Sequence, residues 1–197
     1  MLKAFVTKKT SAAGMYVFNV WIKGIPRIIA VNDKVVWHPS INRPLFTTVG
    51  SDKGMWAPLL EKSWAKVNGN YEAIEGGGPS EAYEYLTNMP TAGYWLTGQY
   101  AITFEEAWNL LVAMNSTNGV ADLGTAGSSD TNTGPLNLPS NHAYSVLNVY
   151  ELQHANSSTP TRLIKIRNPW KKDYGFTGIW ADGNTDMWNK AGETYKE

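Results

Sequence analysis

The order of apolar patterns along the chain limits its fold most strongly. Segments with the character of β-strands stand at both ends: "MYVFNVWI" and "RIIAV" flank the short stretch "KGIP", and "HAYSVLNVYEL" and "RLIKIRN" flank the polar stretch "QHANSSTPT". Each pair is typical of two antiparallel strands joined by a turn or loop. Because helical patterns cluster between the two pairs, the sequence predicts an α+β fold with an antiparallel β-sheet core.

Three helices are predicted between these strand pairs. In "MWAPLLEKSWAKV" the apolar residues recur at the helical period, and a proline such as Pro58 is tolerated only in the first turn, so the helix should begin near residue 55. In "TFEEAWNLLVAMN" the threonine and the second glutamate have the spacing of a capping box. A short helix is expected to start at Pro79. The side chains expected on buried helix faces include Trp56, Trp64, Phe104, Trp108 and Val112.

Composition excludes several classes of function. A chain of 197 residues is long enough for one domain with a sizeable core, so a single domain is expected over residues 1–197. Lysine plus arginine equals aspartate plus glutamate, 17 of each, which gives no net attraction to nucleic acid. The chain has no cysteine and no apolar run long enough to span a membrane. These features predict a soluble cytoplasmic protein without a thiolate metal site or a cysteine nucleophile of its own.

A long polar loop, residues 124–141, leads to His142 at the start of a predicted strand. If the last two strands pair as a hairpin centred near Ala155, residues directly opposite each other have index sums of about 310. His142 would then face Asn168 in the sequence "RNPW". A histidine acting as a general base needs a partner that fixes its tautomer, and an asparagine carbonyl suffices in a cysteine–histidine couple. The alternative is a half-exposed sheet histidine near an ordinary Asn-Pro strand end.

Several motifs in this chain resemble those of one protease family. "HAYSVL", "LIKIRNPW" and "TGIWAD" are similar to the second catalytic subdomain of the calpain family of intracellular cysteine proteases. "LLEKSWAKVNGNYEAIEGG" and "GMYVFNVWIKG" resemble the family's helix with its following loop and its opening strands, so the likeness runs over roughly residues 14–188. The resemblance implies the β-rich half of a papain-like core. It also implies that His142 is the general base, that Asn168 orients it, and that Trp170 lines the substrate cleft.

The same resemblance implies partners and a metal. The family carries its cysteine on a first subdomain, in a Q-G-x-x-G-x-C-W motif that this chain lacks, so that subdomain and protein substrates are the expected partners. The family's second subdomain binds calcium through acidic residues after the N-P-W motif. Asp182 stands where one ligand is expected, and Asp173 is a possible substitute for another. Calcium binding is therefore possible in a full-length protein and doubtful for this chain.

Two functions remain open from the sequence. The chain is either the His/Asn half of a calpain-like endopeptidase, inactive in isolation, or a non-catalytic calpain-like interaction or regulatory module. Ser145 cannot replace the cysteine, because three positions along a strand place it on the face opposite His142. The joint presence of His142, Asn168 and Trp170 favours the first function, since a scaffold has no chemical need of this trio.

Overall fold

The computed structural model describes residues 10–51, 53–117, 119–153, 158–170 and 174–191. The chain divides into two compact units, an N-terminal unit that ends at Gly93 and a C-terminal unit that begins at Tyr94. The single domain expected from chain length stays a prediction, because compactness alone does not show whether the units fold together. Among the described residues, no helix is long and apolar enough to cross a membrane.

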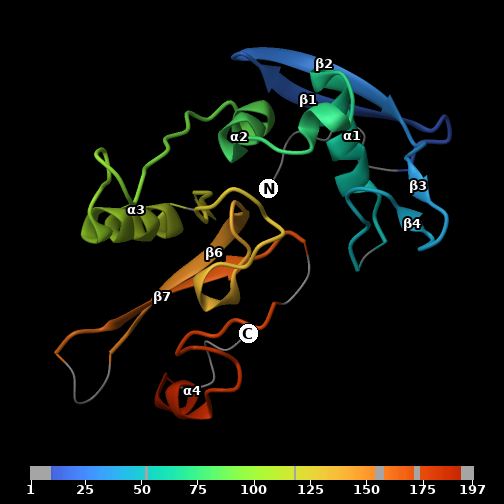
Figure 1. The fold of residues 1–197 in the computed structure, drawn as a ribbon. Helices are drawn as coiled ribbons and strands as arrows, with labels where there is room; N and C mark the ends of the chain where they lie inside the picture. Colours follow the sequence, from blue (N-terminus) through green and yellow to red (C-terminus); the bar gives the residue numbers. More distant parts are fainter. Residues whose placement is uncertain (1–9, 52, 118, 154–157, 171–173, 192–197) are drawn as a thin grey trace. The chain divides into compact units, whose positions relative to one another are not determined.

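The N-terminal unit is built on one β-hairpin, drawn in blue in Figure 1. Strand β1 (Met15–Ile22) pairs antiparallel with β2 (Ile25–Asn32), and Ile22 lies opposite Ile25. The turn is therefore only Lys23-Gly24, with φ angles of 51° and 76° at these two residues. Positive φ at both central positions is the requirement of a type I′ turn. The second strand starts two residues earlier than expected, because a two-residue turn leaves Ile25 and Pro26 to the ladder.

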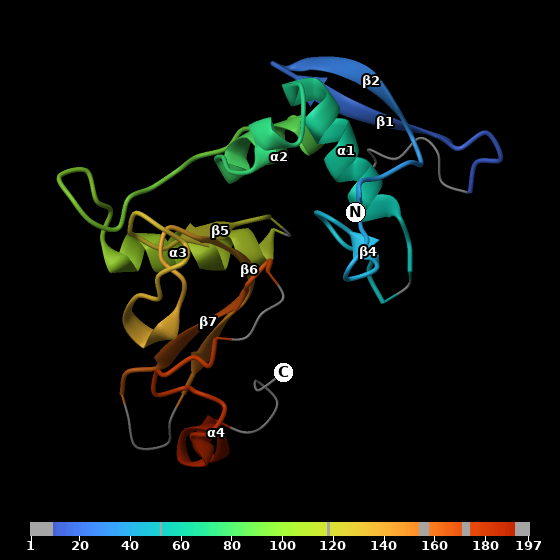
Figure 2. The ribbon, with the colours of Figure 1, turned by 45° about the vertical axis from the view of Figure 1, so that its right-hand side comes forward.

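Two helices cover this hairpin, as Figures 1 and 2 show. They are α1 (Trp56–Asn68) and α2 (Pro79–Thr87), with the short 3-10 helix η1 (Glu72–Ile74) between them. Both α-helices were predicted, and α2 begins at the expected proline. A two-residue ladder of β3 (Trp37–His38) with β4 (Arg43–Pro44) precedes α1. The buried core comprises Phe18, Val20, Val31, Leu59 and Tyr85.

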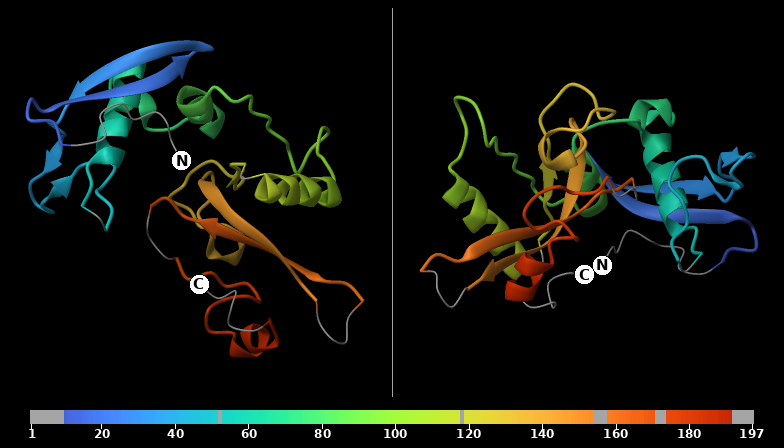
Figure 3. Two further views of the ribbon diagram at one scale, coloured as in Figure 1. Left: turned by 180° about the vertical axis from the view of Figure 1, so that it is seen from behind. Right: turned by 60° about the horizontal axis from the view of Figure 1, so that its bottom comes forward.

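The C-terminal unit contains a three-stranded antiparallel sheet in the order β5-β6-β7. Figure 3 shows the long hairpin of β6 (Ala143–Leu152) and β7 (Thr161–Arg167) in orange, and β5 (Asp122–Gly124) pairs with the start of β6. The other elements are α3 (Phe104–Ser116), the 3-10 helix η2 (Pro135–Asn137) and α4 (Thr185–Ala191). Antiparallel sheets with helices in both units confirm the predicted α+β class.

Helix α3 is fixed at its start and along its buried face. The predicted capping box is present: Thr103 Oγ1 accepts from the Glu106 amide, and the Glu106 carboxylate accepts from the Thr103 amide at 2.8 Å. Trp108 is 3% exposed, and its indole Nε1 donates to Glu151 Oε1 on β6 at 2.9 Å. Arg162 of β7 lies over the same indole, 5.1 Å from the ring centroid. These contacts attach α3 to the two long strands.

The expected burial fails at three apolar positions on these helices. Trp56 is 49% exposed, Phe104 is 69% exposed and Val112 is 42% exposed, whereas Trp64 is partly buried and Trp108 is buried as predicted. Trp56 and Phe104 are the first residues of α1 and α3. A side chain in a first turn can project past the layer that the rest of the helix covers, so periodicity alone overstates its burial.

Candidate functional site

The predicted histidine–asparagine contact is confirmed. His142 directly precedes β6 and Asn168 directly follows β7, so both stand at the open end of the hairpin. His142 Nε2 lies 2.9 Å from Asn168 Oδ1, and both side chains are half-buried. The sequence therefore brings together two polar side chains that are 26 residues apart.

The predicted register of this hairpin is wrong by two residues. Near the open end Ser145 lies opposite Arg167 and Val146 opposite Ile166, so the index sum is 312 rather than 310. Continued outward, this register places His142 diagonally to Asn168 on one face of the sheet. Diagonal neighbours are still within reach of long side chains. The contact survives the error because a shift of two residues returns a side chain to the same face.

One oxygen of Asn168 determines the tautomer of the His142 imidazole. Asn168 Oδ1 also accepts a hydrogen bond from the Trp170 backbone N–H at 3.0 Å. A backbone N–H can only donate, so the atom that it meets must be the amide oxygen and not the amide nitrogen. The facing imidazole nitrogen, Nε2 of His142, must then carry the hydrogen. In the neutral ring this leaves Nδ1 as the nitrogen that can accept a proton.

Two aromatic rings hold the imidazole plane. Tyr144 makes an edge contact with the His142 ring at 4.9 Å between centroids, and Trp170 lies at 4.2 Å. Tyr144 is 3% exposed and its burial raises the pKa of its hydroxyl, whereas Trp170 is 44% exposed. Tyr144 was not predicted as part of the site. The sequence could have indicated this contact, because a residue two positions after the histidine in a strand lies on the same face of the sheet.

The described residues supply no nucleophile on this face of the hairpin. Ser145 is exposed and alternates in β6 with the buried residues Tyr144 and Val146, so it faces away from the imidazole. The sequence has no cysteine. The pair can therefore hold and move a proton, but attack on a carbonyl needs a group from elsewhere.

Of the two expected calcium ligands, the structure describes only Asp182. Asp182 is exposed in the turn that precedes α4, and Asp173 lies outside the described residues. Within residues 10–51, 53–117, 119–153, 158–170 and 174–191, no three side chains of the ligating types His, Cys, Asp and Glu gather as a metal site would need. Calcium takes about six to eight oxygen ligands, which can include backbone carbonyls, so calcium binding stays an expectation.

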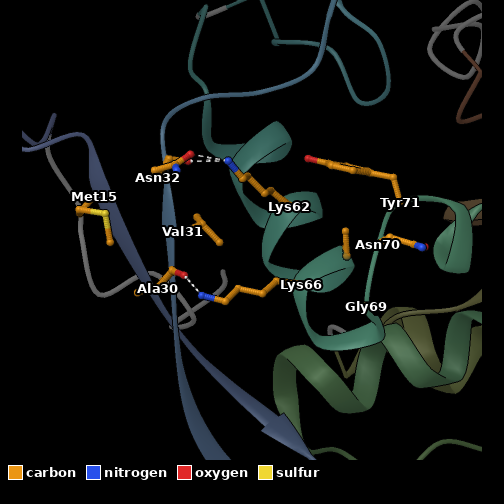
Figure 4. Close-up of a pocket in the computed structure, with 10 residues that line it drawn as sticks. Met15, Ala30, Val31, Asn32, Lys62, Lys66, Gly69, Asn70 and Tyr71 are labelled. Carbon is orange, nitrogen blue, oxygen red and sulfur yellow. Dashed lines mark hydrogen bonds between the residues drawn. The ribbon is translucent and has the colours of Figure 1, made fainter.

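A second candidate site, a cavity of about 440 Å³, lies beside β2 in the N-terminal unit. Figure 4 shows Lys62 and Lys66 of α1 directed at the carbonyl edge of β2. Lys66 Nζ donates to the Ala30 carbonyl at 2.7 Å, and Lys62 Nζ donates to the Asn32 carbonyl at 3.2 Å. Burial lowers the pKa of Lys62. Among the described strands, β2 pairs only with β1. The two lysines donate hydrogen bonds to carbonyls on its other edge, which is a structural role.

Comparison with known proteins agrees with the geometry at His142 and Asn168. A family model described as "Calpain family cysteine protease" matches residues 1–197. Calpain-type cysteine protease DEK1 of Zea mays is 28% identical over 191 residues, which cover 93% of this chain and 8% of that protein. Calpain clp-4 of Caenorhabditis elegans is 28% identical over 191 residues, 94% of this chain and 25% of its own length. The calpain-1 catalytic subunit of Sus scrofa is 32% identical over 184 residues, 90% of this chain and 24% of its own length.

The chain thus spans between 8% and 25% of the length of these relatives. The match covers every element that carries the site, from the strand before His142 to the segment after Asn168. The chain belongs to the calpain family of cysteine proteases.

Proposed function

We propose that this chain supplies the general base and its orienting amide to a calpain-type cysteine endopeptidase. The observation that carries the proposal is the 2.9 Å contact of His142 Nε2 with Asn168 Oδ1, which leaves Nδ1 to accept a proton. The cysteine would come from a first catalytic subdomain outside this chain. Protein substrates would bind against Trp170, whose indole is accessible beside the imidazole. We place the reaction in the cytoplasm, where a chain without disulfides and with a thiol partner would be stable.

The proposed chemistry uses His142 first as a base and then as an acid in each half of the reaction. Nδ1 of His142 takes the proton of the cysteine thiol, and the thiolate attacks the peptide carbonyl carbon. The imidazolium then gives that proton to the leaving amine, and a thioester remains. In the second half, Nδ1 takes a proton from water, and the hydroxide attacks the thioester. The imidazolium then returns the proton to the departing thiolate, which releases the acid and restores the thiol and the neutral imidazole. Asn168 needs only to accept the Nε2–H bond throughout, because the thiolate–imidazolium pair carries its own charges.

The test mixes this chain with a cysteine-bearing first subdomain and follows a fluorogenic peptide. We expect no turnover by the chain alone, because both the thiolate and the oxyanion donors are missing. Turnover should appear on mixing and should be lost with His142→Ala. His38→Ala is the matched control, because this histidine belongs to the N-terminal unit, whereas His142 and Asn168 belong to the C-terminal unit.

Two results would contradict the proposal. Turnover by the purified chain alone that depends on His142 would show a nucleophile within it. A correctly folded mixture without turnover, in which the chain still binds the first subdomain, would support the alternative of a non-catalytic interaction module.

A further inference from the structure

The ladder between β5 and β6 ends immediately before His142. Its last pair is Gly124 with Ala143, so the next pair in the same register is Thr125 with His142. The Thr125 amide donates to the His142 carbonyl at 2.9 Å, as a continued ladder requires. The return bond is different, because the His142 amide donates to Thr125 Oγ1 at 3.1 Å and not to a backbone carbonyl. One residue therefore binds both backbone groups of the histidine.

The threonine hydroxyl is itself oriented. Thr125 Oγ1 has two carbonyl acceptors within reach, that of Pro139 at 2.7 Å and that of His142 at 3.2 Å. Its one hydrogen goes to the nearer carbonyl of Pro139, which leaves its lone pairs for the His142 amide. Pro139 is less than 2% exposed, and its carbonyl also accepts from the Tyr144 hydroxyl at 3.3 Å. The backbone of His142 and the ring that packs on its imidazole are thus anchored on the same buried carbonyl.

We propose that Thr125 is a positioning residue for the base His142. The inference rests on the proposed function and goes beyond it, because the hydrogen bonds found for Thr125 go to backbone groups of His142 and Pro139 and not to the imidazole. His142 lies outside β6, so its backbone is not held by regular strand pairing. The hydroxyl takes the place of the missing carbonyl acceptor and fixes the Cα–Cβ direction from which the imidazole reaches Asn168.

This role also accounts for the polar loop that leads to the histidine. The loop starts at Thr125 and returns at Asn141, whose amide donates to the Ala126 carbonyl at 3.3 Å. Asn141 has a φ of 46°, a left-handed conformation that asparagine tolerates better than most residues. The loop closes on itself at the residue before His142, with the buried Pro139 carbonyl inside it.

The test compares Thr125→Val and Thr125→Ala with Thr125→Ser in the full chain. The observable is the exchange rate of the His142 Nε2–H with solvent, followed by NMR together with the tautomer of the ring. Valine and alanine remove the acceptor for the His142 amide, and loss of one such hydrogen bond should raise the exchange rate on the order of fivefold. Serine keeps the hydroxyl and should restore the wild-type rate.

Thr131→Val is the matched control, because this loop threonine bonds only with Ser129 among the contacts found in the described residues. An equal rise in Thr131→Val would assign the effect to general loosening of the loop and overturn the proposal. So would unchanged exchange in both Thr125→Val and Thr125→Ala, or failure of serine to restore it. Two non-polar variants keep the test usable if one of them folds poorly. None of these measurements needs a cysteine, so their failure is distinguishable from failure of the proposed peptidase activity.

Discussion

Replacement of Trp108 by alanine should loosen the sheet whose open end carries His142 and Asn168. Trp108 is 3% exposed between α3 and the long strands, donates to Glu151 at 2.9 Å and lies under Arg162. Truncation of a buried tryptophan to alanine costs about 3–5 kcal/mol. Loss of the indole N–H donor adds little to this cost in stability, because the Glu151 side chain is 48% exposed to water and keeps its bond from Arg162 at 3.2 Å. We therefore expect a loss of about 4 kcal/mol in the C-terminal unit.

Native-state hydrogen exchange of the β6 and β7 amides measures this loss within the unit concerned. A change of about 4 kcal/mol corresponds to protection factors lower by roughly a thousandfold. Trp108→Phe keeps most of the apolar contact and loses the hydrogen bond, so it should cost about 1–2 kcal/mol. Trp95→Ala is the control in the same unit, because Trp95 is 73% exposed and its loss should change stability by less than ~0.5 kcal/mol. Equal protection in the Trp108 and Trp95 alanine variants would refute the reasoning.

Changes at three further places, Tyr85, Thr103 and Leu147, test other contacts of the fold. Tyr85→Phe removes the hydroxyl that bonds with buried Ser63 at 2.9 Å and should destabilise the N-terminal unit by about 1 kcal/mol in urea unfolding. Burial raises the pKa of Tyr85 above its ordinary value of 10.0, so the neutral phenol contributes its full stability below pH 10.0. As the pH rises through the raised pKa, the wild type should lose this stability, whereas the phenylalanine variant should not. Thr103→Ala breaks the capping box and should cost about 1 kcal/mol in amide protection of α3, whereas serine should retain the cap. The Thr103 amide and hydroxyl lower the pKa of Glu106, so in the wild type this stabilisation should fade as pH falls below the ordinary glutamate value of 4.5. Deletion of Leu147 should leave the imidazole–amide contact intact in NMR spectra, while insertion of an alanine after it should abolish the contact.

Local chemistry made the helices and strands predictable. Pro79 and the Thr103–Glu106 capping box mark helix starts by hydrogen-bonding rules that act over three or four residues, and both starts were found where predicted. Burial was less predictable, because it depends on what lies opposite a side chain. Trp64 packs against the core of the N-terminal unit and Trp108 contacts β6, whereas the equally apolar Trp56 stands in a first turn and remains 49% exposed.

The contact of His142 with Asn168 was predictable from the sequence, but the residues that support it were not. The spacing of His142 and Asn168 across a hairpin, with the resemblance to a known motif, identified two residues of opposite strands. Thr125 carries no such signal, because its role depends on the end of a three-residue strand that periodicity cannot detect. Tyr144 could have been inferred from strand alternation alone. Long-range polar contacts are set by register, and register is a property of the assembled sheet.

The register at the open end of the β6–β7 hairpin is set by a β-bulge between Val146 and Asn148, which the sequence pattern did not predict. From Asn148 to Leu152 the index sum of opposite residues is 313, whereas at Val146 and Ser145 it is 312, so Leu147 is an extra residue on β6. If the sum of 313 continued to the open end, the partner of Asn168 would be Ser145, and His142 would lie on the other face. The bulge lowers the index sum by one and so returns the imidazole to the face of the sheet on which the Asn168 amide lies.

Deletion of Leu147 would give a regular ladder with the same pairs at the open end, which is why the contact of His142 with Asn168 should persist. An added residue would have to be absorbed by a larger bulge, and without one every side chain from Val146 back to His142 would exchange faces. The contact with Asn168 therefore depends on the bulge at Leu147, five positions along the chain from His142, because without a bulge an extra residue on β6 would turn the imidazole to the other face.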